Sequence, residues 1–299
     1  MPPIFRMLRE KGILTPARLV LLFLVILTFI IILSQFFHQS LQGEMADQFN
    51  KQQLLLAQQV AINIEGFINH VFKDIIVISQ LPDVDRIGQS TGTRAVVESI
   101  HVHLERDILV TLRILDRQGT ILYDSALKRE EGKNVAATDY FRAARNLHRN
   151  ERLVTDLLTL PGGKSDAKQI IVAVPIFASA AVGVPPSFRG VVLAALSMDG
   201  ITQKYLAPVK SGTRGYAWMM DNAGTLLYHP TMPQMVGKNL FHTDTSCFQC
   251  HRSFDAEKKM LGSRTETFGL YEAPGGENKL AAFYRVPIGS RPWLVVVSA

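Results

Sequence analysis

A long apolar run near the N-terminus limits what this chain can fold into. Between Leu19 and Leu33 the only polar residue is Thr28, and the run continues through Phe37. A helix rises about 1.5 Å per residue, so a run of this length can just cross a bilayer core of about 30 Å. We therefore expect a transmembrane helix over residues 18–37, preceded by a short cytoplasmic segment over residues 1–17.

Charges on the two sides of the run predict its orientation. Only Glu10 opposes the basic residues before the run, whereas Glu44 and Asp47 follow it; the basic residues are Arg6, Arg9, Lys11 and Arg18. The positive-inside rule then leaves the N-terminus in the cytoplasm. We expect one crossing of a bacterial inner membrane, with the main domain in the periplasm. A cleaved signal peptide is the alternative, but its apolar core is usually only about 7–15 residues long.

A helical pattern follows the apolar run. Apolar residues recur at steps of three, four or seven positions, which form one stripe along a helix. They are Met45, Phe49, Leu56, Val60, Ile64, Phe67, Val71, Ile75 and Ile78. We expect a long stalk helix over residues 38–81. Because an isolated helix of this length needs packing partners, it should lie on its own domain, pair with a second copy in a homodimer, or do both.

Short β runs separated by turns dominate the chain beyond Asp83. We expect strands over 109–115 and 120–123, on either side of the turn Asp116-Arg117-Gln118-Gly119. A helix over 139–147 follows, with Thr138 in the N-cap position, and two apolar runs come after it, over 169–177 and 190–197. The order then returns, with strands over 216–220, 225–228, 264–271, 279–286 and 293–298. We expect an α+β fold with two antiparallel-sheet modules, over 82–205 and 206–299.

This layout resembles the double Cache family of extracytoplasmic sensor domains. The resemblance rests on ILDRQGTILYDS at 114–125, TDYFR at 138–142, GYAWMMDNAGTLLYHP at 215–230 and VGKNL at 236–240. It implies two PAS-like modules on a long N-terminal helix, the first distal from the membrane and the second proximal to it. It also implies a signalling role, with a kinase, chemoreceptor or cyclase as output.

The two cysteines carry the clearest chemical signal. Cys247-Phe248-Gln249-Cys250-His251 has C-x-x-C-H spacing, within an insertion over about residues 240–262. In c-type haem attachment, two thiols at this spacing add to the haem vinyl groups and the histidine binds the iron axially. The motif also lies on the exported side, where such haem is attached. We therefore expect one covalent haem c per chain, held by Cys247, Cys250 and His251.

Three other uses of these residues stay open. A structural zinc could take Cys247, Cys250, His251 and His242, although adjacent Cys250 and His251 suit a tetrahedral site poorly. A dithiol redox pair normally begins a helix of a thioredoxin-like unit, which the surrounding sequence does not resemble. The third alternative is a plain disulfide.

The sequence leaves the second axial ligand of the haem iron open. Met260, His242 and Met235 are the candidates, and His229 and Met232 also lie nearby in the sequence. A methionine ligand would raise the reduction potential relative to a histidine ligand. Ordinary core packing is the alternative role for the methionines, and an open or water-bound iron is the alternative coordination.

The resemblance also points to a ligand pocket in the distal module. Tyr123, Tyr140, Arg142 and Asp156 occupy regions that line the pocket in similar Cache domains. An arginine, a carboxylate and two phenols could hold a small polar or zwitterionic ligand. The structural alternative is that Asp116 and Asp124, which flank a turn, only bond to the backbone.

These observations lead to one expected function and one alternative. The sequence has no G-x-S-x-G elbow, P-loop, H-E-x-x-H or dinucleotide motif, and its 32 basic and 26 acidic residues are scattered. We therefore expect neither an enzyme nor a nucleic-acid-binding protein. The expected function is a membrane-anchored periplasmic haem c sensor of redox state or a diatomic gas. The alternative is a membrane-anchored c-type cytochrome that serves a cytochrome partner.

Overall fold

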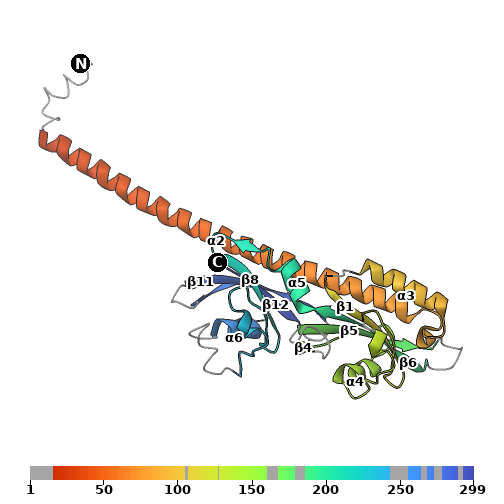
Figure 1. Ribbon diagram of the computed structural model, residues 1–299. Helices are drawn as coiled ribbons and strands as arrows, with labels where there is room; N and C mark the ends of the chain where they lie inside the picture. Colours follow the sequence, from red (N-terminus) through yellow and green to blue (C-terminus); the bar gives the residue numbers. More distant parts are fainter. Residues whose placement is uncertain are drawn as a thin grey trace. The chain divides into compact units, whose positions relative to one another are not determined.

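The computed structural model describes residues 16–104, 107–126, 128–159, 168–178, 186–242, 255–263, 268–272, 278–288 and 292–299 (Figure 1). Its helices are α2 (Pro16–Ser79), α3 (Thr91–His103), α4 (Asp139–Arg145), α5 (Met198–Tyr205) and α6 (Asp255–Gly262), with short 3-10 helices η1 (Val84–Arg86), η2 (Lys128–Glu130) and η3 (Pro233–Met235). Two antiparallel sheets complete the structure, so the expected α+β fold is confirmed.

Helix α2 covers both the expected membrane span and the expected stalk. The chain divides into two compact units, Met1–Gln52 and Gln53–Ala299. In the first unit, the large apolar side chains from Val20 to Phe37 are exposed. Among the described residues, α2 is the one helix that is long and apolar enough to cross a membrane. The chain thus has one candidate membrane helix near its N-terminus.

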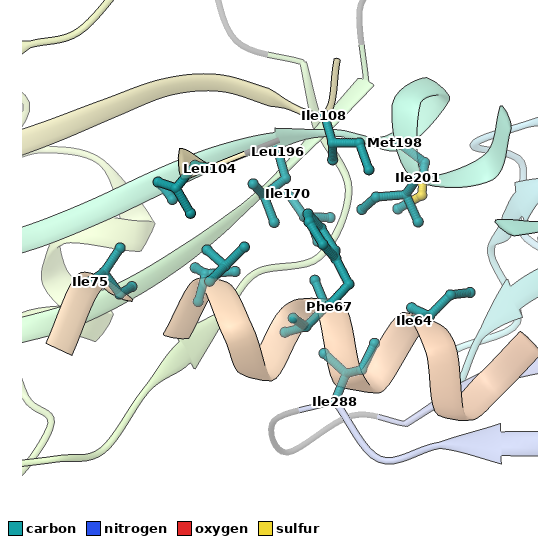
Figure 2. Close-up of a cluster of buried hydrophobic side chains, with 14 of the residues drawn as sticks. Ile64, Phe67, Ile75, Leu104, Ile108, Ile170, Leu196, Met198, Ile201 and Ile288 are labelled. Atoms are coloured by element: carbon teal, nitrogen blue, oxygen red, sulfur yellow. The ribbon is translucent and has the colours of Figure 1, made fainter. Parts of the chain in front are cut away.

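In the second unit, one face of α2 is buried in the main hydrophobic core. Figure 2 shows Ile64, Phe67 and Ile75 of α2 pointing toward strand residues that include Ile170 and Leu196. The predicted stripe is confirmed from Val60 to Ile78, where its members are 7% exposed or less. Such burial is the main source of stability for a long helix.

The predicted stripe is not buried at all of its positions. Met45 is 68% exposed and Leu56 is 36% exposed, and the buried positions next to Leu56 are taken by Gln53 and Ala57. The side-chain amide of Gln53 is fully buried and has no hydrogen-bond partner within the described part of the chain. An apolar pattern could not reveal a buried glutamine, because hydropathy assigns polar residues to the surface.

The first sheet follows the order β2-β1-β6-β5-β3, with β4 also paired to β5. Its strands are β1 (Leu109–Asp116), β2 (Ile121–Asp124), β3 (Leu153–Val154), β4 (Leu158–Thr159), β5 (Lys168–Phe177) and β6 (Phe188–Ser197). One face joins the core under α2, and the other packs against α4 through Tyr140, Phe141 and Ala144 (Figure 1). Burial on both faces explains why β5 and β6 read as continuous apolar runs.

The second sheet follows the order β10-β11-β12-β8-β7, with β9 also paired to β8. Its strands are β7 (Lys210–Ser211), β8 (Gly215–Asp221), β9 (Leu226–Tyr228), β10 (Phe268–Glu272), β11 (Asn278–Val286) and β12 (Trp293–Ser298). Alternate residues divide between its faces: Trp293, Val295 and Val297 join the main core, whereas Leu294 and Val296 belong to a separate cluster.

The first hairpin of each sheet has the same hydrogen bonds in its turn, as the sequence predicted. The Asp116 carboxylate accepts from the Thr120 amide at 2.8 Å, and the Asp221 carboxylate accepts from the Thr225 amide at 2.7 Å. Gly119 and Gly224 adopt φ of 83° and 85° in the two turns, a region that favours glycine. The same turn chemistry therefore builds both sheets.

Two local expectations need correction. The chain beyond Asp83 does not begin with strands, because η1 and α3 precede β1. The hydroxyl of Ser90, the N-cap residue of α3, accepts from the Thr93 amide at 3.4 Å. Thr138 does occupy the N-cap of α4, but its hydroxyl donates to the Val135 carbonyl at 2.7 Å and makes no capping bond. Both differences arise from local hydrogen bonds that hydrophobic periodicity does not register.

Candidate functional site

The C-x-x-C-H motif lies between two described segments of the second sheet module. Cys247, Cys250 and His251 fall within residues 243–254, outside the described residues. The described chain reaches His242 on one side of the motif and resumes with α6 at Asp255 on the other. These two flanks and the sheet face against which α6 packs are the described parts of the chain next to the motif in sequence.

An apolar cluster covers the face of the second sheet that is turned away from the main core. Strands β8, β11 and β12 supply Trp218, Met220, Ala281, Phe283, Leu294 and Val296, and α6 supplies Met260. Trp218 satisfies its indole N–H by donating to the Ser298 hydroxyl at 2.8 Å. Each side chain of this cluster is 5% exposed or less, so this face of the sheet is packed as part of the hydrophobic core.

Two of the three candidate axial ligands are buried beside this surface. Met260 is 5% exposed within the cluster, and Met235 is 6% exposed in a smaller cluster. Leu226 and Leu240 pack against both clusters, so the two methionines lie in neighbouring apolar surroundings. His242, by contrast, is exposed. The candidate ligands therefore differ in burial: the two methionines are buried and the histidine is exposed.

Arg285 of β11 holds the C-terminal end of α6. Its guanidinium donates to the carbonyl oxygens of Met260 at 3.2 Å, Leu261 at 3.1 Å and Ser263 at 2.5 Å. A cation at a helix C-terminus satisfies carbonyl groups that have no partner within the helix. Arg285 is therefore a positioning residue for Met260, and no sequence motif marked it.

His229 is a further residue of this region that sequence reasoning left unranked. Its side chain is 7% exposed, and its ring centroid lies 5.2 Å from that of Tyr216 and 6.2 Å from that of Trp218. Its Nδ1 lies 3.2 Å from the Thr231 hydroxyl. The aromatic side chains of the adjacent strand β8 contact the imidazole and contribute to its burial.

Glu257 places a buried carboxyl group on α6, one turn before Met260. Its side chain is 2% exposed, and burial raises its pKa to about 7. A hydrogen bond with its own backbone opposes this shift, and the nearby Asp255 carboxylate adds to it. A group with such a pKa changes charge near neutral pH.

The four predicted pocket residues of the first sheet do not come together. The pairing of β1 with β2 shifts by one residue between Ile114 and Leu115. As a result, Tyr123 of β2 faces the α2 side of the sheet, while Ile121 faces the α4 side. Tyr140 lies on the α4 side. The bulge therefore puts the two phenols on opposite faces of the sheet.

The charged members of the predicted pocket are also directed elsewhere. Arg142 is 65% exposed and donates to Asp139, one turn away on α4, at 2.5 Å. Asp156 is exposed between β3 and β4. Asp124 is buried and accepts from Arg113 at 2.7 Å and from the Thr111 hydroxyl at 2.8 Å. This arrangement favours the structural role for Asp124, and a ligand pocket built from these four residues stays a prediction.

The described residues contain no group of three or more His, Cys, Asp or Glu side chains that is placed to hold a metal ion. The candidate motif itself lies outside that part of the chain.

Comparison with known proteins identifies the family. The family model dCache_1, described as a Cache domain, matches residues 37–299. The chain therefore belongs to the Cache-domain family, and the double Cache resemblance is confirmed. No curated protein sequence matches the chain.

Solved structures share this fold at low sequence identity. The ligand binding domain of a Pseudomonas aeruginosa amino acid chemoreceptor, PctB, in complex with L-Arg, is 14% identical, with a TM-score of 0.59 over 84% of this chain and 87% of that one. The periplasmic sensory domain of the Campylobacter jejuni chemoreceptor Tlp1 is 15% identical, with a TM-score of 0.61 over 85% and 95%.

A third solved structure is longer than this chain. An extracellular ligand binding receptor from Desulfohalobium retbaense is 13% identical, with a TM-score of 0.58 over 83% of this chain. The match covers 40% of that receptor. Likeness at these identities establishes the fold that the chain shares with sensor domains.

Proposed function

We propose that this chain is a membrane-anchored periplasmic sensor whose second module carries one covalent haem c. Membership of the Cache family and the likeness to chemoreceptor sensory domains support the sensor role. The basic residues before the apolar run support a cytoplasmic N-terminus. Within this proposal, residues 82–205 form the distal module and residues 206–299 the proximal one.

The C-x-x-C-H motif is the observation that carries the haem proposal. Cys247 and Cys250 would form the thioether links, and His251 would bind the iron. A bound haem would supply an iron that changes oxidation state and takes a diatomic ligand. Met260 and Met235 pack inside apolar clusters and His242 is exposed, so the second iron ligand stays open among these three residues and a free position for a diatomic ligand.

Covalent attachment is tested by expression with a c-type haem maturation system. The purified chain should gain the mass of one haem and keep its colour through acid-acetone extraction, because thioether bonds survive this treatment. Cys250→Ala should lose the double attachment, and His251→Ala should change the reduced absorption spectrum. Arg117→Ala, an exposed substitution in the β1–β2 turn, should leave both properties intact. A colourless protein with one zinc per chain would contradict the proposal.

A second experiment separates the sensor from the alternative electron carrier. A sensor must couple haem state to a conformational equilibrium, since a ligand shifts an equilibrium only through differential affinity. We expect hydrogen exchange along α2, or dimer affinity, to differ between oxidised, reduced and CO- or NO-bound full-length chain. A carrier would show the same exchange in all states and fast electron transfer to another exported cytochrome. That outcome would replace the sensor proposal with the carrier.

The output partner follows from the same reasoning. A signal that reaches α2 is carried by the helix that contains the candidate membrane span. A cytoplasmic kinase or chemoreceptor-type signalling partner could therefore receive it, through a homodimer of this chain or through an associated protein. Two of the three similar structures named above are chemoreceptor domains, which supports this class of partner.

A further inference from the structure

A cavity of about 920 Å³ lies at the C-terminal end of α2. Its lining comes from the last residues of α2, the loop that contains η1, the turn at Arg149 and Asn150, strand β5 and the start of β6. The buried part of the lining is apolar, with Val174 and Ile176 belonging to the main core. The cavity is thus on the α2 side of the first sheet, away from the α4 side.

Three arginines from separate parts of the chain line this cavity: Arg86 of η1, Arg149, and Arg189 of β6. Arg189 is already paired, with its Nη1 at 3.2 Å from the Asp85 carboxylate. Arg149 donates from Nη2 to the Ala178 carbonyl at 2.9 Å, which leaves its other N–H groups available. Arg86 makes no side-chain hydrogen bond or ion pair with any residue in the described ranges.

The charge of the cavity favours an anion. Its three guanidinium groups outnumber the two carboxylates of Asp83 and Asp85. A concave surface with low-dielectric walls concentrates such a field. Guanidinium groups also bind a carboxylate through two parallel hydrogen bonds, which are about twice as strong as neutral ones. Arg86 and Arg149 therefore provide donors for an anionic group above an apolar surface.

Two turns with left-handed backbone border the cavity. Asp83 and Asn150, with φ of 52° and 67°, are the two residues other than glycine that have positive φ across the described ranges, and both line the cavity. Aspartate and asparagine are the residues other than glycine that adopt this left-handed region most readily, so these two positions form tight turns at the rim of the cavity.

We propose that this cavity binds a small organic anion made of one carboxylate and an apolar body. Arg86 and Arg149 hold the carboxylate, and the apolar body covers Ile76 and Ile176. Because Ile76 and Ser79 belong to the last turn of α2, an occupied site stabilises the end of the helix that carries the candidate membrane span. The proposal stands apart from the haem, since no cavity residue lies in the second sheet module.

The test uses full-length chain in detergent and hexanoate as the probe, titrated calorimetrically at constant ionic strength. Hexanoate should bind saturably. Arg86→Ala and Arg149→Ala should each raise its Kd about tenfold or more, because each removes a charge-assisted hydrogen bond. Arg117→Ala removes the same charge from an exposed turn elsewhere and should change Kd less than about twofold. Arg86→Lys should recover part of the lost affinity.

Companion probes separate the two halves of the proposed ligand. Acetate should bind at least about tenfold more weakly than hexanoate, and Ile76→Ala should narrow that difference, because burial of each methylene is favourable. Hexan-1-ol, which lacks the carboxylate, should not compete with hexanoate. The proposal is overturned if native chain does not bind hexanoate, if Arg117→Ala weakens binding as much as Arg86→Ala does, or if hexan-1-ol or inorganic phosphate binds as tightly as hexanoate.

Discussion

Replacing Ile64 by alanine is expected to lower the free energy of unfolding by about 4 kcal/mol. Ile64 lies on the buried face of α2, is fully shielded from solvent and packs in the core that joins α2 to both sheets (Figure 2). Alanine removes three carbon atoms and leaves a cavity that close-packed neighbours fill only partly. The loss should appear in urea denaturation of the detergent-solubilised full chain, followed by circular dichroism.

Ile62 provides a matched control on the same helix. It lies two residues earlier and is 49% exposed. Ile62→Ala deletes the same atoms but creates no buried cavity, so the free energy of unfolding should fall by less than about 1 kcal/mol. Equal losses for the two variants would contradict the described packing of α2. A loss confined to Ile62→Ala would mean that the helix is rotated by about half a turn from the described face.

Glu257→Gln is expected to stabilise the protein at pH 8 and to change little near pH 4. Burial raises the pKa of Glu257 from 4.5 to about 7 in the folded state. Between these two values the folded state binds more protons than the unfolded state, so the stability of the native chain falls as pH rises. The loss is complete once the pH passes the folded pKa, and it amounts to about 3 kcal/mol. Glutamine has no proton to lose and avoids this loss.

The measurement compares urea midpoints of native and variant chains from pH 4 to pH 8. The difference between them should grow across the window from 4.5 to about 7 and then level off. Glu98→Gln, at an exposed position on α3, should retain the pH dependence of the native chain. A stability difference that does not vary with pH would contradict a buried, titrating Glu257 and would indicate a packing effect of the amide.

The pH response has a consequence for the proposed haem site. Glu257 precedes Met260 by one turn of α6, and Arg285 holds the end of that helix. Ionisation of Glu257 near neutral pH would therefore act on the same short helix that presents a candidate axial ligand. Met260 of α6 packs against Trp218 and Phe283 of the second sheet, so a change in the position of α6 would change this contact.

Several features followed from the sequence because their physics is local. The apolar run, the helical stripe from Val60 to Ile78 and the two hairpins with Asp and Gly at equivalent turn positions need only periodicity and turn chemistry. The family assignment followed from the order of these motifs and is confirmed over residues 37–299. The C-x-x-C-H motif is equally local, because thioether attachment depends on residues within five positions.

Other features were decided by the tertiary structure. A single register shift in β1 and β2 places Tyr123 and Tyr140 on opposite faces, since one extra residue reverses the side to which a strand's side chains point. Arg86, Arg149 and Arg189 meet at one cavity because the end of α2 and the ends of β5 and β6 pack together. Gln53 is buried by its position on the helix despite its polarity. Each depends on contacts between segments far apart in the chain, which no local pattern contains.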